Sequence, residues 1–356
     1  MLSFKQLYTM MNNYKKIFII VSTILIVQQN LLFAINLKIQ EKVRVDSINT
    51  FKLKDIHIRD PYILPDKQSG LYYLYRSASV KNKNGQELGG VEVFWSRDLK
   101  EWSGPKRVFT VLENNWISGT IWAPEIHFYK GKYYLFGTLN TNKTWKEPKP
   151  DWPAFTYRGT QIFHADSPEG PFLPFGIMPH TPIDFMALDG TLWEEDGKPY
   201  MIYCHEWVQI VDGTIEMIEL KTDLSEPIGT PEFLFRASDA PWTPDKANSY
   251  VTDGCFLYRT KTGKLLMIWS SFLQNGNYAI GIAESTTGKL IGPWIHHIEP
   301  LVDENGGHGS IFLTFEGKLC LVLHQPNSPN GKERAQIFEL NDEGNSLVIK
   351  GKLIMD

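Results

Sequence analysis

Residues 188–204 read LDGTLWEEDGKPYMIYC, and the layout of this stretch recurs along the chain. A polar residue, Asp189, opens a β-rich run, Gly197-Lys198 makes a turn, and a second apolar and aromatic run follows. Short runs of this kind, bounded by glycine, asparagine, aspartate and proline, are typical of β-strands joined by tight turns. The stretch therefore predicts two strands, the second running back antiparallel to the first.

Five segments share this layout. Their openings are Asp60, Glu125, Asp189, Asp253 and His308, at spacings of 65, 64, 64 and 55 positions. The matching turns are Ser69-Gly70-Leu71, Gly131-Lys132, Gly197-Lys198, Gly263-Lys264 and Gly317-Lys318. A repeating unit of about 60 residues with four strands is typical of a propeller blade. The sequence thus predicts an all-β fold, a five-bladed β-propeller that forms a single domain over residues 55–356.

The N-terminal residues are predicted to lie outside this fold. Lys15 and Lys16 precede an apolar run over residues 17–27, the pattern of a secretory signal peptide. The run is short for a spanning helix, which needs roughly 20 apolar residues. We expect a signal peptide over residues 1–34, a lead-in segment over 35–54, and an exported protein, periplasmic or secreted. An uncleaved N-terminal anchor is the alternative; with the peptide cleaved, no stable membrane partner is expected.

Composition narrows the class of protein. The hydrophobic fraction of 42% is normal for a globular chain, and the net charge of −4 gives no electrostatic reason to expect a nucleic-acid partner. The three cysteines, Cys204, Cys255 and Cys320, cannot all pair within the chain. Their apolar, strand-like surroundings predict buried free thiols.

The residues that open the five segments are the candidate catalytic residues. The first strand of each blade lines the central axis of a propeller, so four carboxyl groups and one imidazole are expected to meet at one mouth of the channel. One Asp-Gly pair alone would indicate only a turn, but crowded carboxyls push their pKa values apart and separate an acid from a base. Glycoside cleavage needs such a pair. No phosphate loop, paired-cysteine metal motif, zinc helix or Gly-x-Ser-x-Gly motif competes.

Six motifs at these positions resemble glycoside hydrolase family 43. They are Arg59-Asp60-Pro61-Tyr62, Trp122-Ala123-Pro124-Glu125, Leu188-Asp189-Gly190-Thr191, Cys204-His205-Glu206-Trp207, Thr252-Asp253-Gly254 and Gly307-His308-Gly309. The resemblance covers nearly the whole mature chain. It implies a five-bladed propeller that hydrolyses arabinosides, xylosides or galactosides of plant-type polysaccharides or oligosaccharides, with inversion, by direct displacement with water.

The resemblance also implies catalytic roles. By this resemblance, Asp60 occupies the position of the family's general base. Asp189 occupies the position of the carboxylate that orients the general acid and tunes its pKa, and Asp184 is the alternative for that second role. The family places a glutamate at the fourth opening, where this chain has the shorter Asp253. Glu206 is the other candidate acid, because it follows a returning strand and neighbours Trp207, whose apolar ring would raise its pKa. Both candidates stay open.

Further residues are predicted to bind substrate. Trp122 and Trp207 flank the catalytic positions and are expected to stack on the sugar, and Glu125 and His308 are expected to line the same mouth. In the family this histidine faces the channel and often helps hold a hydrated ion. Calcium prefers oxygen ligands, so a calcium or other ion at His308 would need waters or carboxylates as well. No cofactor is expected to be required.

Two alternative functions remain open. A fructan-cleaving type of propeller hydrolase also uses an early aspartate in an Arg-Asp-Pro context. A carbohydrate-binding propeller without catalysis is permitted by Asp253 in place of glutamate. The sequence indicates an oligosaccharide or polysaccharide ligand in all of these cases.

Overall fold

The computed structural model describes residues 49–81, 85, 87–113, 115–117 and 119–353. The predicted signal peptide and most of the predicted lead-in segment lie outside these residues. The chain divides into two units, residues 1–49 and Thr50–Asp356, and the second unit is described below. Among the described residues, no helix has the length and apolar character needed to cross a membrane.

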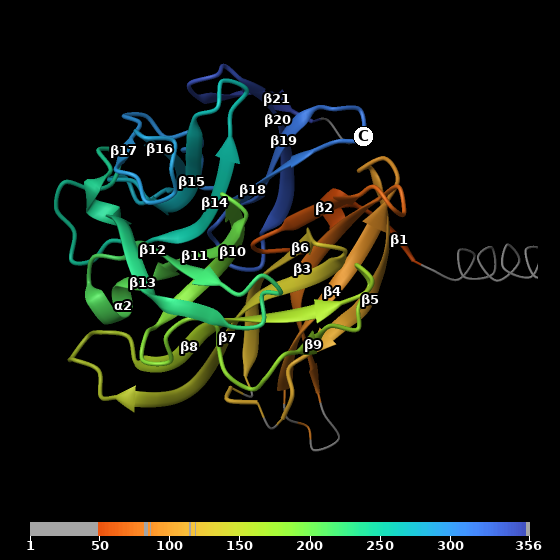
Figure 1. Cartoon of the computed structure of the whole chain (residues 1–356), viewed down its shortest axis with the longest axis horizontal. Coiled ribbons are helices and arrows are strands. Elements are labelled where there is room, and N and C mark those ends of the chain that lie inside the picture. Colours follow the sequence, from red (N-terminus) through yellow and green to blue (C-terminus); the bar gives the residue numbers. More distant parts are fainter. Residues whose placement is uncertain (1–48, 82–84, 86, 114, 118, 354–356) are drawn as a thin grey trace, which may run out of the picture. The chain divides into compact units, whose positions relative to one another are not determined.

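Thr50–Asp356 contains five antiparallel sheets, each made of strands that are consecutive in sequence. Figure 1 shows them following one another around a common centre, from the orange first blade to the blue fifth blade, which lies beside the first. Within the described part of the chain, helical structure is limited to α2 (Trp207–Ile210) and two 3-10 turns, Leu53–Asp55 and Ala237–Asp239. The predicted all-β, five-bladed propeller is confirmed.

Each blade has four strands. Blade 1 contains β2 (Tyr62–Asp66), β3 (Leu71–Lys81), β4 (Glu87–Ser96) and β5 (Glu101–Thr110), with β1 (Thr50–Lys52) added beyond β5. Blade 2 contains β6 (Thr120–Tyr129), β7 (Lys132–Lys146), β8 (Phe155–Ala165) and β9 (Leu173–Pro174). Blade 3 contains β10 (Ala187–Glu195), β11 (Lys198–His205), β12 (Thr214–Leu220) and β13 (Pro227–Arg236). Blade 4 contains β14 (Asp253–Arg259), β15 (Leu265–Phe272), β16 (Tyr278–Ser285) and β17 (Trp294–His296). Blade 5 contains β18 (Gly307–Leu313), β19 (Leu319–Gln325), β20 (Arg334–Asp342) and β21 (Leu347–Lys352).

The hydrophobic core lies between the blades rather than within one central mass. Side chains alternate along a strand, so both faces of an inner strand are buried against neighbouring blades. On β15, Met267 and Trp269 pack in a cluster with blade 3, whereas Leu266 and Ile268 pack in a cluster with blade 5. This double burial explains the continuous apolar run of this strand. All three cysteines are buried and free, as predicted.

Blades 1 and 5 share no sheet. Side-chain packing and a few hydrogen bonds therefore join them and close the ring. One buried cluster combines residues of both blades, among them Ile58 and Val322. The Ile58 amide donates to the Glu333 carbonyl at 3.3 Å, and the Arg334 guanidinium donates to the Lys54 carbonyl at 2.8 Å. Residues 50–54, assigned to the lead-in segment, thus form β1 and part of this junction.

The five predicted turns connect the first and second strands of the five blades. Each contains a glycine with φ between +67° and +89°, a left-handed conformation that favours glycine. The five glycines are Gly70, Gly131, Gly197, Gly263 and Gly317. The predicted turns are therefore confirmed in all five units.

The blade openings differ from the predicted alignment in two blades. In every blade one residue close to the start of the first strand, from two residues before it to the fourth residue within it, has a left-handed backbone, with φ between +41° and +57°. These five residues are Asp60, Ala123, Asp189, Gly254 and His308. Glu125 lies two residues after the equivalent position, and Asp253 lies one residue before it. Asp253 is the first residue of β14, as predicted, but Glu125 lies inside β6, so the prediction that it opens its strand is wrong: a carboxylate near the expected spacing was taken for the opening itself.

Gly254 is required at its opening for two reasons. Its φ is +53°, and a Cβ atom there would lie 2.8 Å from the ring of His308. Gly254→Ala is expected to reduce the free energy of unfolding by about 2–5 kcal/mol. Gly263→Ala is the control, because Gly263 has a φ of +89° with no atom near the added Cβ, and should cost about 1–2 kcal/mol. Equal losses in urea unfolding would show that contact with His308 contributes nothing.

Candidate active site

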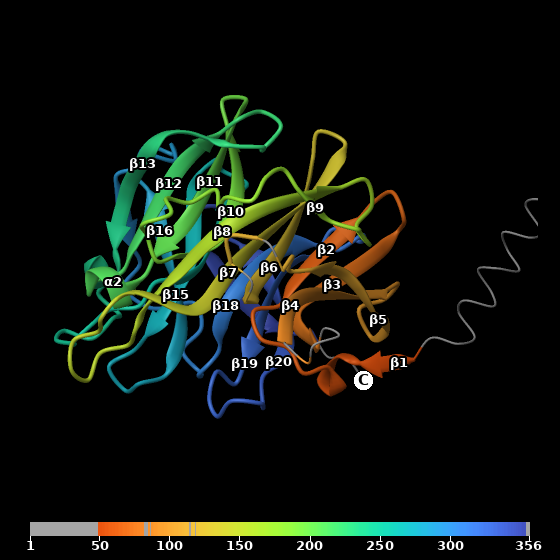
Figure 2. The same cartoon turned by 90° about the horizontal axis from the view of Figure 1, so that it is seen from below.

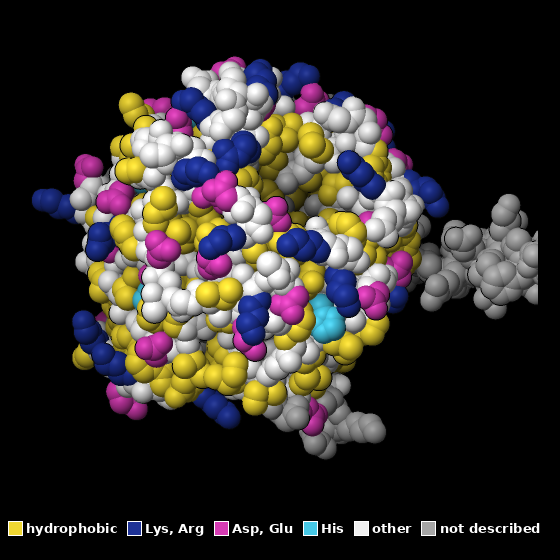
Figure 3. Space-filling view, in the orientation of Figure 1, with side chains coloured by type: hydrophobic (Ala, Val, Ile, Leu, Met, Phe, Trp, Pro, Cys, Tyr) yellow, Lys and Arg dark blue, Asp and Glu magenta, His cyan; other side chains and the backbone are white. Residues whose placement is uncertain are grey.

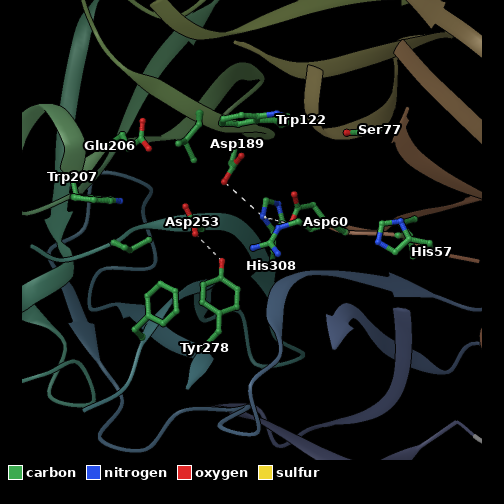
Figure 4. Close-up of a pocket in the computed structure, with 15 residues that line it drawn as sticks. His57, Asp60, Ser77, Trp122, Asp189, Glu206, Trp207, Asp253, Tyr278 and His308 are labelled. Carbon is green, nitrogen blue, oxygen red and sulfur yellow. Dashed lines mark hydrogen bonds and ion pairs between the residues drawn. The ribbon is translucent and has the colours of Figure 1, made fainter. Parts of the chain in front are cut away.

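A pocket of about 520 Å³ lies at the mouth of the channel, where the first strands begin. It is lined by His57, Ile58, Arg59, Asp60, Ser77, Trp122, Leu188, Asp189, Glu206, Trp207, Val251, Asp253, Phe272, Tyr278 and His308. Figure 4 shows the four predicted catalytic carboxyl groups directed into the same space. Its volume falls within the range of small-molecule sites. The structure therefore brings together Asp60, Asp189, Glu206 and Asp253 from three different blades.

Asp60 is surrounded by positively charged or hydrogen-bonding groups. Its Oδ1 atom lies 3.2 Å from Nδ1 of His308 and 3.3 Å from Nδ1 of His324, and Nε of Arg59 is 3.9 Å away. Its backbone amide donates to Nδ1 of His324 at 3.2 Å. Burial alone would raise the pKa of Asp60, but His308, His324 and Arg59 hold it well below its usual value. Asp60 is therefore an ionised carboxylate at neutral pH.

His308 links Asp60 to Asp189. Its Nδ1 atom is 3.7 Å from Oδ2 of Asp189 (Figure 4), and the same carboxyl oxygen accepts the amide hydrogen of Gly254 at 3.0 Å. Burial is the main cause that raises the pKa of Asp189 to about 7; His308 opposes the rise, and Asp253 and Asp60 add to it. Two neighbouring aspartates thus have pKa values displaced in opposite directions, a separation typical of catalytic carboxyl groups.

Asp253 faces the pocket from the position just before the blade 4 opening. The hydroxyl of Tyr278 donates to its Oδ2 atom at 2.9 Å. Burial raises the pKa of Asp253, while His308 and the Tyr278 hydrogen bond oppose the rise. Tyr278 is itself held between Phe272 and His324, at ring-centroid distances of 5.1 Å and 5.8 Å. This fixes the direction of the Asp253 carboxyl group.

Glu206 follows β11 directly, as predicted, and is buried beside the pocket. Its carboxylate forms an ion pair with Arg158 of β8, whose guanidinium also lies 4.6 Å from the ring centre of Trp122. Burial raises the pKa of Glu206; Arg158 lowers it, and Asp253 raises it further. The net pKa lies above that of an ordinary glutamate, which favours the protonated form that a proton donor needs.

A wall beside Glu206 is made by the long hairpin of blade 2. Both views of the fold show β7 and β8 reaching α2 (Figures 1 and 2). The indole of Trp152 donates to the Val208 carbonyl at 2.7 Å and packs edge to face on Trp207 at 5.3 Å. Trp207 is thereby fixed with its ring at the pocket. Trp122 and Trp207 both line the pocket, but their stacking on sugar stays a prediction.

Two predicted residues lie elsewhere. Glu125 is buried on β6 and pairs with Nε2 of His127 at 2.9 Å; it does not line the pocket, although its charge helps to raise the pKa of His308. Asp184 is exposed, and its backbone carbonyl accepts a hydrogen bond from Gln209. The structure therefore places Asp189, and not its alternative Asp184, beside the other carboxyl groups.

The predicted ion at His308 has few ligands in this region. Among the described residues, no group of three His, Cys, Asp or Glu side chains is placed to hold a metal ion. Nδ1 of His308 faces Asp60 and Asp189, and an imidazole nitrogen is a poor calcium ligand. The described side chains do not by themselves form a calcium site, and an ion here stays a prediction.

Sequence reasoning missed four side chains that hold the carboxyl groups. Arg158, Tyr278 and His324 lie on second or third strands, so no blade-opening motif includes them. Arg59 was part of the Arg-Asp-Pro-Tyr motif but was given no role. Its position next to Asp60 was the one available signal.

Comparison with known proteins agrees with this geometry. The profile of Glycosyl hydrolases family 43 matches residues 54–346. An alpha-L-arabinofuranosidase from Humicola insolens is 20% identical, over 64% of this chain and 49% of the relative. An extracellular exo-alpha-(1->5)-L-arabinofuranosidase from Cellvibrio japonicus is 20% identical, over 82% of this chain and 85% of the relative. The chain thus spans about half the length of the first relative.

The fold is also similar to that of a solved structure. The endo-arabinase from Bacteroides thetaiotaomicron superposes with a TM-score of 0.72 and 35% sequence identity, over 83% of this chain and 99% of that one. The match to the family profile covers well over half of the sequence, and four of the six motifs supply the carboxyl groups of the pocket, Asp60, Asp189, Glu206 and Asp253. The chain belongs to glycosyl hydrolases family 43.

Proposed function

We propose that this chain is an enzyme that hydrolyses O-glycosidic bonds in plant-type oligosaccharides or polysaccharides, with arabinosides as the favoured substrates over xylosides and galactosides. The preference for arabinosides rests on the relatives named as arabinofuranosidases and an endo-arabinase. The observation that carries the proposal is the pocket shared by Asp60, Asp189, Glu206 and Asp253. Such a pocket supplies both an ionised carboxylate and carboxyl groups with raised pKa values.

The proposed reaction is a single displacement by water. Asp60 accepts a proton from the water, which attacks the anomeric carbon as the glycosidic bond breaks. A carboxylic acid on the other side gives its proton to the departing oxygen, and the configuration of the sugar inverts. Glu206 is the favoured donor, since Figure 4 shows it and Asp60 to either side of Asp189. No step requires a metal ion or another cofactor.

The surroundings of Glu206 suit a donor that must lose its proton during each turnover. Arg158 stabilises the carboxylate that remains, whereas burial and the nearby Asp253 favour the protonated acid before reaction. The adjacent His205 also favours the ionised form of Glu206. Burial raises the pKa of Asp189, which favours its protonated form and so adds less negative charge to the site than an ordinary carboxylate would.

Arg158→Gln is expected to move the alkaline limb of the pH profile of kcat/KM to higher pH. Arg158 lowers the pKa of Glu206, so its loss leaves the acid protonated at higher pH. Arg158→Lys keeps the positive charge and should leave the limb close to that of the wild-type enzyme. An unmoved limb in Arg158→Gln would exclude Glu206 as the titrating donor and favour Asp253.

A direct test uses chromogenic arabinosides, xylosides and galactosides, with proton NMR to follow the first anomer released from an oligosaccharide. Hydrolysis with inversion supports the proposal. Retention of configuration would contradict the single displacement, and binding without turnover on every substrate would favour a carbohydrate-binding propeller.

The surface charge is mixed on the face that Figure 3 shows. Lysine, arginine and acidic side chains are interspersed there, and they form no continuous stripe of one charge.

We also propose that the protein is exported. Two of the matching arabinofuranosidases are named extracellular, and the apolar run of residues 17–27 fits a cleaved signal peptide. Mass spectrometry of the protein recovered from medium or periplasm should give a mature chain that starts close after residue 34. A full-length mass in the membrane fraction would support the anchor instead.

A further inference from the structure

His205 is a buried histidine at the end of β11, directly before the proposed proton donor Glu206. Its Nδ1 atom lies 3.1 Å from Oε1 of Glu216 on β12, and its Nε2 atom lies 3.0 Å from Oε1 of Gln209 on α2. A neutral imidazole carries a hydrogen on only one ring nitrogen, so it can donate only one of these two bonds. The protonation of the ring therefore depends on whether both partners are acceptors.

The Gln209 side chain presents an acceptor to the ring. Its Oε1 atom accepts the Met186 amide hydrogen at 2.6 Å, and its Nε2 atom donates to the Asp184 carbonyl at 2.8 Å. Exchanging the oxygen and nitrogen of this amide would set a donor against a donor and an acceptor against an acceptor. Two backbone groups thereby fix the orientation of the amide, and its oxygen faces Nε2 of His205.

The Glu216 side chain is also an acceptor. Its Oε1 atom accepts a hydrogen bond from the Thr214 hydroxyl at 2.9 Å, and its Oε2 atom accepts one from the Tyr203 hydroxyl at 3.0 Å. Burial would raise the pKa of Glu216, but His205 and the two hydroxyl groups hold it below its usual value. Glu216 is therefore an ionised carboxylate at neutral pH, and both nitrogens of His205 face acceptors.

We propose that His205 is an imidazolium, held by Glu216 and Gln209, and that it acts as a positioning residue for the proton donor Glu206. With a hydrogen on each nitrogen the ring donates to both acceptors, and the Glu216 carboxylate balances its charge. Phe185 stacks on the ring at a centroid distance of 4.1 Å, close enough for an aromatic face to attract a cation. The inference rests on the proposed function and deepens it, because it gives a role to a histidine that does not line the reaction pocket.

The contacts of His205 fix the backbone around Glu206. The Gln209 side chain bonds both to His205 and to the Met186 amide. The Met186 carbonyl accepts the Glu206 amide hydrogen at 2.8 Å, and the backbone amide of Gln209 donates to the Glu206 carbonyl at 3.0 Å. His205 thus helps to set the turn from which the Glu206 side chain reaches the pocket.

The positive charge of His205 also tunes the acidity of Glu206. Burial raises the pKa of Glu206, and Arg158 is the main group that lowers it. Asp253 raises it further, whereas His205 lowers it again. The charged groups that face the two side chains from other strands are Arg158 on β8, Asp253 on β14 and Glu216 on β12. Loss of the charge on His205 should therefore raise the pKa of Glu206, and the acid then keeps its proton to higher pH.

NMR on protein with isotope-labelled histidine tests the state of the ring directly, because protonated and bare ring nitrogens resonate at different positions. His205→Gln identifies the His205 signals by their loss, and Glu216→Gln identifies them by a shift if the first variant does not fold. We expect both ring nitrogens of His205 to be protonated at neutral pH. One bare nitrogen would overturn the proposal, whether or not the protein cleaves a glycoside.

Kinetics test the effect on the donor. His205→Gln should move the alkaline limb of the pH profile of kcat/KM to higher pH by about half a pH unit or more. His297→Gln is the matched control and should leave the limb in place, because His297 also faces a glutamate, Glu284 at 3.9 Å, but does not line the pocket. If His205→Gln does not fold, Glu216→Gln replaces it. Without its counter-ion the ring loses its charge, and the limb should again move to higher pH.

The outcomes separate this proposal from the proposed function. If Arg158→Gln moves the limb and His205→Gln only lowers kcat/KM, the role of His205 is merely structural and the proposal is overturned. If neither variant moves the limb, Glu206 is not the donor, and the proposal falls with that assignment. If the wild-type protein cleaves no glycoside, the proposed function fails and takes the role toward Glu206 with it, while NMR still decides whether the ring is an imidazolium.

Discussion

Asp60→Asn is expected to lower kcat/KM by about 10²- to 10⁴-fold on every glycoside that the wild-type enzyme cleaves. An amide cannot accept the proton of the attacking water, and the low pKa of Asp60 shows how strongly the site is built to hold an ionised carboxylate at this position. The loss should be similar for good and poor leaving groups, because activation of water does not depend on the departing oxygen. Steady-state kinetics on nitrophenyl glycosides and oligosaccharides measure both.

The fold should survive this substitution. The Asp60 amide still donates to His324 at the junction of blades 1 and 5, and asparagine has nearly the same shape as aspartate. Asp184→Asn, an exposed change outside the pocket, is the control and should leave the rate unchanged. A rate within threefold of wild type in Asp60→Asn, with Tm preserved, would remove Asp60 as the base.

Glu206→Gln is expected to lower kcat/KM by about 10²- to 10⁴-fold on oligosaccharides, with a much smaller loss on a dinitrophenyl glycoside. A leaving group that departs readily as an anion needs little protonation, so it masks the absence of the donor. The raised pKa of Glu206 and its burial at the pocket are the physical grounds. Kinetics on both substrates give the ratio that identifies the donor.

Asp253→Asn provides the comparison. If Asp253 only raises the pKa of Glu206 by its charge, its loss should shift the alkaline limb of the oligosaccharide profile to lower pH and leave the rates on both substrates close to wild type at pH values below that limb. A leaving-group effect confined to Asp253→Asn would instead identify Asp253 as the donor. A loss that is independent of the leaving group in both variants would reject both assignments.

The five-bladed architecture could be predicted because each blade repeats the same short-range sequence features. The glycine turns and the acidic openings recur at a blade-sized spacing, and inner strands with both faces buried read as apolar runs. The convergence of Asp60 and Asp189 followed from that repeat alone. Glu206 was found because the end of a returning strand comes back to the face where the first strand begins.

The rest could not be predicted, for two physical reasons. At Ala123 and Gly254 the opening residue carries no polar group, so a nearby carboxylate was mistaken for it and Glu125 was placed in the pocket. The site is also reached by side chains on second or third strands of their blades, Arg158, Tyr278 and His324. Their contacts depend on how neighbouring blades face each other, which local spacing does not record.

The contacts of Asp60 also have a bearing on when activity can arise. Asp60 depends on His324, which lies 264 positions further along the sequence, and on His308, also in the fifth blade. A protein is synthesised from its N-terminus, and domains fold as units. On a ribosome, the emerging polypeptide would therefore hold an isolated aspartate with an ordinary acidity until the fifth blade joins the first. The proposed hydrolysis would therefore begin only after blade 5 has folded against blade 1.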